Sequence, residues 1–261
     1  MTVVQITVVV VFWAWAYEYN WWKVAGTMAC LDVVTWVFGE IGFFLSRGTV
    51  DEFNWWRVGR AFKHFSKSPY VVIVASLSAF SVAMVVWYGL RLPAMQYDVY
   101  HVVRGVLMMQ TGHLPPFGWD GQGVDYYPGN MDMLYAWRVL GTRNDALFAN
   151  VQLYFGLAGC LAIYGISRNL IRASRETSAI VAMCLFSMTT VIHSSWLALA
   201  DLGAAGMYWC AVGVASSKRL TAWDLALIAL AGGWAVGAKS SLGYWVAGLA
   251  VFVIWRVWHE K

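Results

Sequence analysis

Residues 95–132 read MQYDVYHVVRGVLMMQTGHLPPFGWDGQGVDYYPGNMD, and they form the longest polar interruption in an otherwise strongly apolar sequence. At α-helical spacing, Asp98, His101 and Arg104 fall on one side of a helix. The opposite side is apolar and consists of Val99, Val102, Val103, Val106 and Met109. This pattern predicts an amphipathic helix that lies on a membrane surface with its apolar side down. The prolines, glycines and aspartates of the second half predict an ordered loop.

The composition predicts that the rest of the chain is a membrane protein. The 261 residues are 60% hydrophobic and 12% charged, and the mean hydropathy is +0.58. Soluble domains carry about 25% charged residues. The low charge therefore predicts an all-α fold, a polytopic membrane helix bundle with interfacial amphipathic helices. The 17 Trp and 13 Tyr residues are of the kinds that favour membrane interfaces.

Charge and cysteine content argue against a nucleic-acid partner and against cysteine-based sites. The net charge of +4 is modest and does not indicate a nucleic-acid partner. Each cysteine lies singly in an apolar segment, without the spacing of a metal site. We therefore expect neither a disulfide nor a thiolate metal site from the four cysteines, Cys30, Cys160, Cys184 and Cys210.

Apolar runs separated by polar segments predict about eight transmembrane helices. The expected spans are residues 3–17, 23–45, 70–90, 146–166, 177–195, 197–216, 225–239 and 242–255. Opposed Trp/Phe and Arg/Lys faces within 46–69 predict a basic amphipathic helix on an anionic leaflet. We therefore divide the chain into 1–69, a helix pair plus this amphipathic helix, and 70–261, a transmembrane module with an outer loop at 91–145.

Lysine and arginine residues gather in alternate connections, which sets the expected topology. The positive-inside rule places both termini and segments 46–69, 167–176 and 217–224 in the cytoplasm. The loop 91–145 then faces outward. We expect an integral membrane protein of the plasma membrane with membrane lipids around it.

Three charged residues could carry chemistry, and each has a simpler alternative. Asp98 could act as a general base, or bind a divalent metal ion with His101, or only be an acid favoured by a helix dipole. Asp201 could face a cavity or simply lie at the outer interface. Lys239 could hold a phosphate, or its ammonium could extend to the membrane interface.

The order of four segments resembles the GT-C superfamily of integral-membrane glycosyltransferases, which includes protein O-mannosyltransferases and lipid A aminoarabinose transferases. YDVYHVVRGVLMMQTGHL resembles the family's catalytic acid and the helix after it, and YYPGNMDMLYAW resembles the turn that returns the outer loop to the membrane. SSWLALADLGAAGMYW and WAVGAKSSLGYW resemble two later segments, one with an Asp that opens a helix and one with a Gly-x-x-x-Lys pattern. The resemblance covers roughly residues 70–250.

The resemblance implies a transferase that uses a polyprenyl-phosphate-linked sugar on the extracytoplasmic side. Asp98 would be the catalytic base. Substrate would be bound by His101, Arg104, Tyr127, Asp201 and Lys239. We expect Asp98, Asp201 and Lys239 to converge on one outward-facing cavity.

The alternative hypothesis is a non-catalytic scaffold subunit of a larger membrane complex, derived from the same helical module. Family enzymes are commonly longer, and many carry a second acid where this chain has Val99. These departures favour the scaffold, with other membrane subunits as partners. The presence of Asp98, Asp201 and Lys239 together favours the enzyme.

Overall fold

A computed structural model describes residues 68–91, 101–111, 129–142, 151–195 and 199–259 of the chain. All regular structure in these ranges is helical. The helices are α4 (Pro69–Arg91), α5 (His101–Thr111), α6 (Asn130–Thr142), α7 (Val151–Asn169), α8 (Arg175–Ser187), α9 (Thr189–Ser195), α10 (Asp201–Ala215), α11 (Ala222–Ala238), the short 3-10 helix η3 (Ser240–Leu242) and α12 (Gly243–His259). The expected all-α class is confirmed for this part of the chain. The N-terminal helix pair and the basic amphipathic helix predicted within 1–67 lie outside the described residues.

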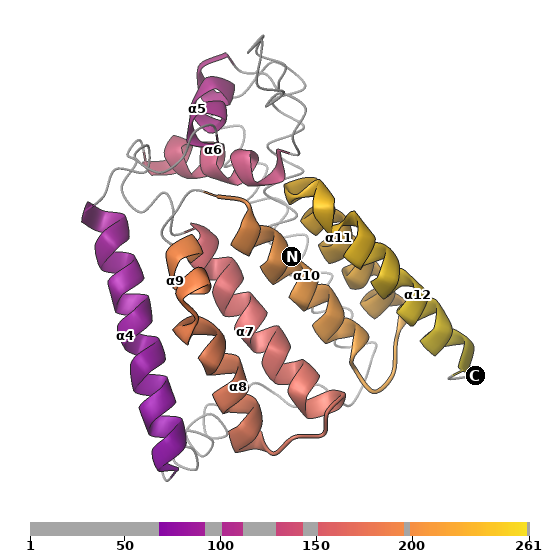
Figure 1. The fold of residues 1–261 in the computed structure, drawn as a ribbon. Coiled ribbons are helices and arrows are strands. Elements are labelled where there is room, and N and C mark those ends of the chain that lie inside the picture. Colours follow the sequence, from indigo (N-terminus) through magenta and orange to yellow (C-terminus); the bar gives the residue numbers. More distant parts are fainter. Residues whose placement is uncertain (1–67, 92–100, 112–128, 143–150, 196–198, 260–261) are drawn as a thin grey trace, which may run out of the picture.

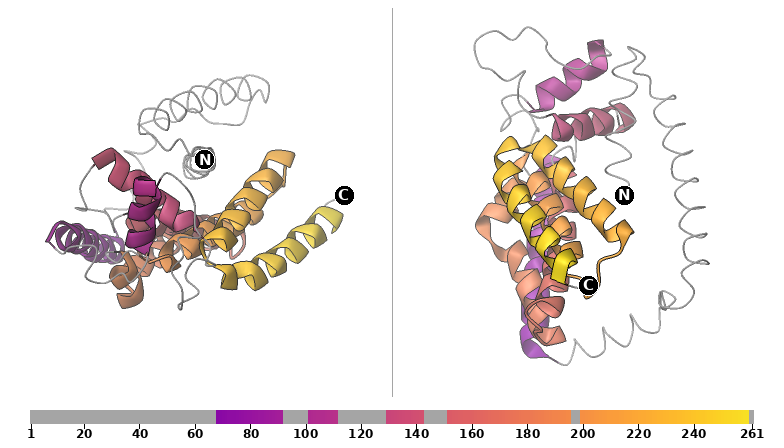
Figure 2. Two further views of the ribbon diagram at one scale, coloured as in Figure 1. Left: turned by 90° about the horizontal axis from the view of Figure 1, so that it is seen from above. Right: turned by 90° about the vertical axis from the view of Figure 1, so that its right-hand side faces the viewer.

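Most of the helices stand side by side in a row, α6 lies across one end of it, and α5 rises from α6 (Figure 1). Along the row, α4 packs against α8, α8 against α7, α7 against α10, and α10 against α11. Helices α5 and α6 pack on each other above the row, as the right-hand view of Figure 2 also shows. The fold therefore has two distinct ends, one beneath α5 and α6 and one formed by the turns from α7 to α8 and from α10 to α11.

Local sequence signals explain where two helices of the row begin. Helix α8 follows Ser174, whose hydroxyl accepts a hydrogen bond from the Thr177 backbone N–H at 3.1 Å. Helix α11 follows Thr221, which forms a reciprocal capping box with Asp224. Such caps satisfy N–H groups that have no partner within the helix.

The segment expected as one span over 177–195 is broken in the structure, so that prediction is wrong in detail. Helix α8 ends at Ser187, Met188 is extended, and α9 begins at Thr189. The Met188 N–H bonds to the Leu185 carbonyl at 3.2 Å, which closes α8 with a tighter turn. Apolar composition gave no sign of this break.

The outer loop expected over 91–145 contains two helices, and the second was not anticipated. Helix α6 occupies Asn130–Thr142, where a loop was expected. Its buried side chains Met131, Leu134 and Tyr135 follow helical spacing. The polar residues around α6 favoured the expectation of a loop, so the helical spacing of its apolar residues was not recognised.

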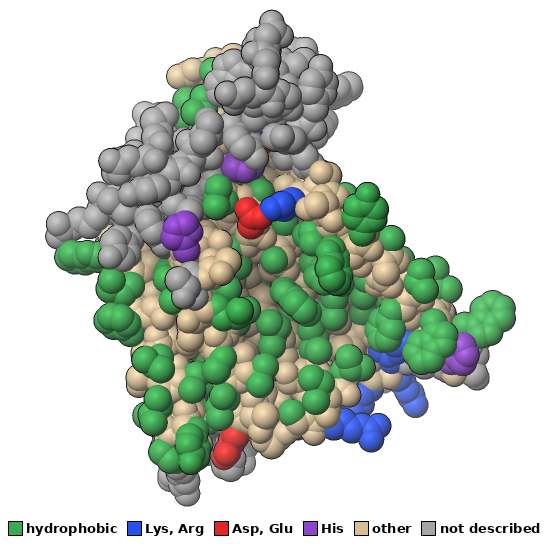
Figure 3. Space-filling model, in the orientation of Figure 1, with side chains coloured by type: hydrophobic (Ala, Val, Ile, Leu, Met, Phe, Trp, Pro, Cys, Tyr) green, Lys and Arg blue, Asp and Glu red, His purple; other side chains and the backbone are tan. Residues whose placement is uncertain are grey.

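Buried apolar side chains hold the row together in two clusters. One joins α4, α7, α9 and α10 through Val85, Leu153, Val191 and Leu202. The other joins α10, α11 and α12 through Ala211, Ala215, Ile228, Leu249 and Val253. Many large apolar side chains nevertheless remain exposed, among them Tyr244 and Trp258, and hydrophobic residues spread over the face in Figure 3. Such a surface differs from that of a typical soluble domain.

Two helical segments within the described ranges are long and apolar enough to cross a membrane. They are Pro69–Trp87 in α4 and Ser240–His259, which joins η3 and α12. Helix α11 is also apolar but shorter. By length and composition, this is the part of the predicted membrane bundle that the described residues support.

Candidate functional site

A buried cluster of three ionisable side chains joins α5 to α6. The His101 Nδ1 lies 2.5 Å from Asp132 Oδ1, and Arg104 Nη1 lies 2.9 Å from Asp132 Oδ2. Asp132 is fully buried, and Arg104 is only 1% exposed. Removing charges from water is costly unless they are paired, so this cluster fixes how the two helices pack.

The position of this cluster corrects the expected orientation of α5. The sequence predicted that the polar side of this helix would point away from the membrane. His101 and Arg104 instead face α6 and are buried against it. A carboxylate on a second helix, absent from the periodicity argument, accounts for the difference. In this structure both predicted substrate-binding residues contact Asp132 inside the protein.

A second charged pair lies at the same end of the row. Lys239, directly after α11, forms an ion pair with Asp201, the first residue of α10. Their side chains are 45% and 50% exposed. An exposed ion pair contributes only about 0–1 kcal/mol. An anionic ligand could therefore compete for Lys239 at small cost in stability.

The start of α6 connects the two charged groups. The Asn130 side-chain amide donates to the Trp234 carbonyl of α11 at 3.1 Å. A Cβ added to Gly203 of α10 would overlap Met131, and one added to Gly237 of α11 would overlap Asn130. Glycine thus permits α6 to approach both helices within two residues of Asp201 and Lys239.

Two further hydrogen bonds fix the beginning of α10 beneath α6. The Tyr135 hydroxyl donates to the Leu199 carbonyl at 2.7 Å. Buried Gln152 of α7 accepts a hydrogen bond from the Gly203 backbone N–H at 2.6 Å. The backbone that carries Asp201 is therefore attached to two neighbouring helices.

The structure brings together two of the three residues expected to converge. Asp201 and Lys239 are in direct contact. Asp98 and Tyr127 lie outside the described residues, although Asp98 precedes the start of α5 by three positions. The position and the role of Asp98, the expected catalytic base, therefore stay predictions.

The expected metal site also stays a prediction. His101 uses its Nδ1 atom toward Asp132, so that nitrogen serves the contact between α5 and α6. Within the described ranges, no three His, Cys, Asp or Glu side chains are grouped as ligands. Asp98, the other expected ligand, lies outside those ranges.

Asp132 is a charged residue of this cluster that was not predicted, because it lies within 91–145, where a loop was expected. A helix-start signal was present. Asp132 follows Pro128 and Gly129 and precedes helically spaced apolar residues, which is typical of an acid in a first turn. Its pairing with a residue 31 positions earlier could not be read from this signal.

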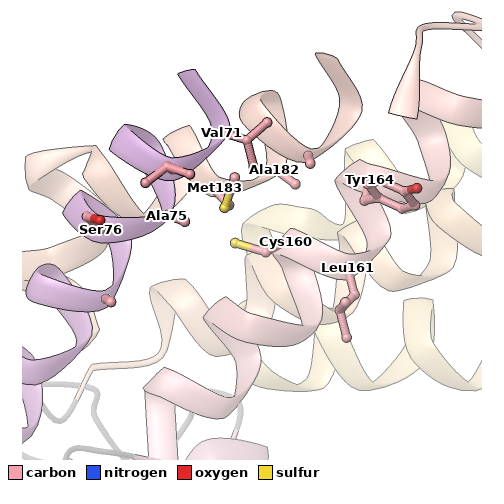
Figure 4. Close-up of a pocket in the computed structure, with 11 residues that line it drawn as sticks. Val71, Ala75, Ser76, Cys160, Leu161, Tyr164, Ala182 and Met183 are labelled. Atoms are coloured by element: carbon pink, nitrogen blue, oxygen red, sulfur yellow. The ribbon is translucent and has the colours of Figure 1, made fainter. Parts of the chain in front are cut away.

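An apolar groove of about 700 Å³ lies between α4, α7 and α8. Figure 4 shows its lining, with the Cys160 and Met183 side chains directed into the space between the helices. Val71, Ala75 and Leu161 are also among the lining residues. A hydrocarbon chain is the ligand class that matches such a surface.

Comparisons of this chain with protein-family models, with curated proteins and with solved structures found no match.

Proposed function

We propose that this chain is an integral-membrane glycosyltransferase that moves a sugar from a polyprenyl-phosphate donor to an acceptor on the extracytoplasmic side. The observation that carries the proposal is the position of the Asp201–Lys239 pair. It lies beside α6, whose Asp132 joins the buried cluster with His101 and Arg104. An accessible cation at the end of a row of apolar helices suits a lipid-linked phosphate.

The membrane arrangement is part of the same proposal. The chain crosses the plasma membrane about eight times, with both termini in the cytoplasm and the 91–145 region outside. Two observations support it. Two described helices have the length and composition of spans, and basic residues gather in the turns at the end of the row away from α5 and α6.

The reaction is a direct displacement at the anomeric carbon of the donor sugar. The acceptor hydroxyl oxygen forms a bond to that carbon, and the bond from the carbon to the phosphate oxygen breaks. Asp98 takes the hydroxyl proton, and polyprenyl phosphate leaves with the bonding electrons. Attack opposite the leaving group inverts the configuration of the sugar carbon.

Lys239 meets the negative charge that develops on the departing phosphate, because a preorganised cation stabilises such charge most effectively. Asp201 holds the ammonium in place before the donor binds. His101 and Arg104 act as positioning residues, because their contacts with Asp132 fix α5 and thus the backbone leading to Asp98. Tyr127 contacts the bound substrate in this proposal.

The apolar groove between α4, α7 and α8 is the described surface that best suits part of the prenyl chain. Its lining contains small residues such as Ala75 and Ala79, which leave room along the helix. The phosphate would lie at the α6 end and the chain would run between the helices toward the opposite end.

The test is transfer by the purified full chain, reconstituted in lipid, with a panel of polyprenyl-phosphate sugars. The released polyprenyl phosphate is measured. Asp98→Asn should lower turnover by roughly 10²–10⁴-fold, which is the contribution of a well-placed base. Lys239→Ala should raise the donor concentration needed and lower turnover. A chelator added to the same assay tests the metal hypothesis.

Glu176→Gln provides the control, because Glu176 is an acid in the first turn of α8 at the other end of the row. Its turnover should match that of the parent chain. Equal losses in Asp98→Asn and Glu176→Gln would contradict the assigned role of Asp98. A folded, membrane-inserted parent chain that releases no polyprenyl phosphate from any donor would leave the scaffold hypothesis in its place.

A further inference from the structure

A basic pocket of about 740 Å³ lies at the end of the row away from α5 and α6. Three separate segments form it: the turn from α7 to α8, the turn from α10 to α11, and the last turns of α12. Four cationic side chains line it, namely Arg168, Arg172, Lys218 and Arg256, and the lining contains no acid. Figure 3 shows lysine and arginine side chains gathered at this end of the molecule.

Two of the four cations form hydrogen bonds to backbone carbonyls around the pocket. Arg256 Nη1 donates to the Ala215 carbonyl at 2.5 Å and to the Ser217 carbonyl at 2.9 Å. Ala215 is the last residue of α10 and Ser217 lies in the turn after it, where a cation also complements the helix dipole. Arg168 donates to the Ala173 carbonyl across the turn that follows α7. Both guanidinium groups therefore hold the turns in position.

Within the part of the chain that the structure describes, the other two cations line the pocket without such a bond to the backbone. Arg172 and Lys218 are exposed, and within the described ranges no carboxylate lies within ion-pair distance of either. Arg172 also has a φ of 58°, in the left-handed region that glycine adopts most easily. An arginine at this turn position presents its charge to the pocket at some cost in backbone energy.

Aromatic side chains indicate where this pocket lies relative to a bilayer. Phe252 and Trp255 stand in the lining beside the cations, and Trp258 is exposed one turn further along α12. Tryptophan next to arginine and lysine at the end of apolar helices is typical of the headgroup level of a membrane. Basic pockets between helices at this level bind phosphate-containing headgroups.

We propose that this pocket binds the phosphate of an anionic phospholipid headgroup in the cytoplasmic leaflet, through Arg172 and Lys218. Arginine and lysine supply charge-assisted hydrogen bonds to phosphate oxygens, and Trp255 contacts the glycerol and upper chain region. The inference rests on the membrane placement given under the proposed function and is independent of the transferase activity.

The experiment compares lipid retention by the full chain purified from vesicles of phosphatidylcholine mixed with phosphatidylglycerol. Native mass spectrometry counts each lipid on the protein. The parent chain should retain phosphatidylglycerol preferentially. The double variant Arg172→Gln/Lys218→Gln should lose about tenfold or more of that preference, because it removes the two cations assigned to the headgroup phosphate. Thermal unfolding verifies that the variant is folded.

The matched control is Arg175→Gln/Arg219→Gln. It also removes two positive charges from this end of the molecule, but neither residue lines the pocket. It should keep the preference for phosphatidylglycerol. Equal losses in the two double variants, or no preference in the parent chain, would overturn the proposal. Inorganic phosphate binding as tightly as phosphatidylglycerol would overturn the assignment to a lipid. A parent chain that fails to float with pure phosphatidylcholine vesicles would refute the membrane placement itself.

Discussion

Asp132 and Asp201 are both aspartates, but they differ in burial. This difference in burial distinguishes the two charged groups of the site. Asp132 is fully buried between His101 and Arg104. Asp201 is half exposed and pairs with Lys239. A buried charge pair is costly to break, whereas an exposed pair adds little stability. We therefore assign a structural role to the first carboxylate, and the exposed second pair is the one that the proposed function uses to bind phosphate.

We predict that Asp132→Asn lowers the free energy of unfolding by roughly 3–5 kcal/mol, because it removes the carboxylate charge facing two buried side chains. Asp201→Asn should lower it by less than about 1 kcal/mol. Denaturant titration of both variants in the same detergent measures the difference. Similar losses in the two variants would contradict the conclusion that the buried Asp132 contributes more to stability than the exposed Asp201.

The sequence anticipated one of these two groups. An acid opening one apolar segment and a lysine closing another were expected at the same membrane level, and Asp201 and Lys239 do pair. The partner of His101 and Arg104 was not anticipated, because periodicity describes a single helix and says nothing about a side chain on another element. Asp132 could be located only once the packing of α5 on α6 was known.

At the scale of elements, α7 and α10 pack through small residues. A Cβ on Gly159 would lie 3.6 Å from the Gly206 Cα, and one on Gly213 would lie 3.1 Å from the Ala162 Cβ. Close approach of two backbones through glycine and alanine is typical of helix pairs in membranes. These two helices therefore form the centre of the row.

We predict that Gly206→Ala disrupts this interface, because its new Cβ would overlap the backbone carbonyl of Phe155. Backbone atoms cannot move aside as a flexible side chain can, so we expect a loss of at least about 2 kcal/mol. Gly233→Ala is the control, since its Cβ would meet no atom within 4 Å. It should leave stability unchanged or raise it by up to about 1 kcal/mol. Thermal unfolding in detergent measures both, and equal melting temperatures would contradict the close packing.

Helix boundaries were predicted closely where an apolar run is uninterrupted, as for the expected span 70–90, which corresponds to α4, Pro69–Arg91. The expected span at 225–239 corresponds to α11, Ala222–Ala238, which begins at the Thr221–Asp224 capping box. Helix α6 and the break at Met188 were missed. The first lay among polar residues, and the second is a local backbone change inside a uniformly apolar run.

At the scale of the whole molecule, the row of helices separates two chemically different ends. The Asp201–Lys239 pair and the α5–α6 cluster lie at one end, and the basic pocket lies at the other. This separation agrees with the alternation of basic connections along the sequence. Helix α11 runs from the end with the basic pocket to the end with Lys239. Whether this helix crosses the bilayer therefore tests whether the two ends lie on opposite sides of the membrane.

We predict that α11 crosses the bilayer. Its 17 residues span about 26 Å at 1.5 Å per residue, slightly less than a hydrocarbon core of about 30 Å. Local thinning of the bilayer can accommodate so small a mismatch. Polar residues stand at both ends, with the Thr221–Asp224 cap at one and Lys239 at the other. The helix therefore has a boundary at each membrane surface.

Two single-cysteine variants test this crossing, in a background with the four native cysteines replaced by alanine. Ser240→Cys lies beside Lys239, and Arg219→Cys lies just before α11; both side chains are exposed. An impermeant maleimide added to intact cells should label Ser240→Cys, whereas Arg219→Cys should react only after permeabilisation. Labelling of both from one side would show that α11 does not cross. Labelling of Arg219→Cys in intact cells, with Ser240→Cys reacting only after permeabilisation, would still show that α11 crosses. It would place the Asp201–Lys239 pair in the cytoplasm and so contradict an extracytoplasmic transferase site.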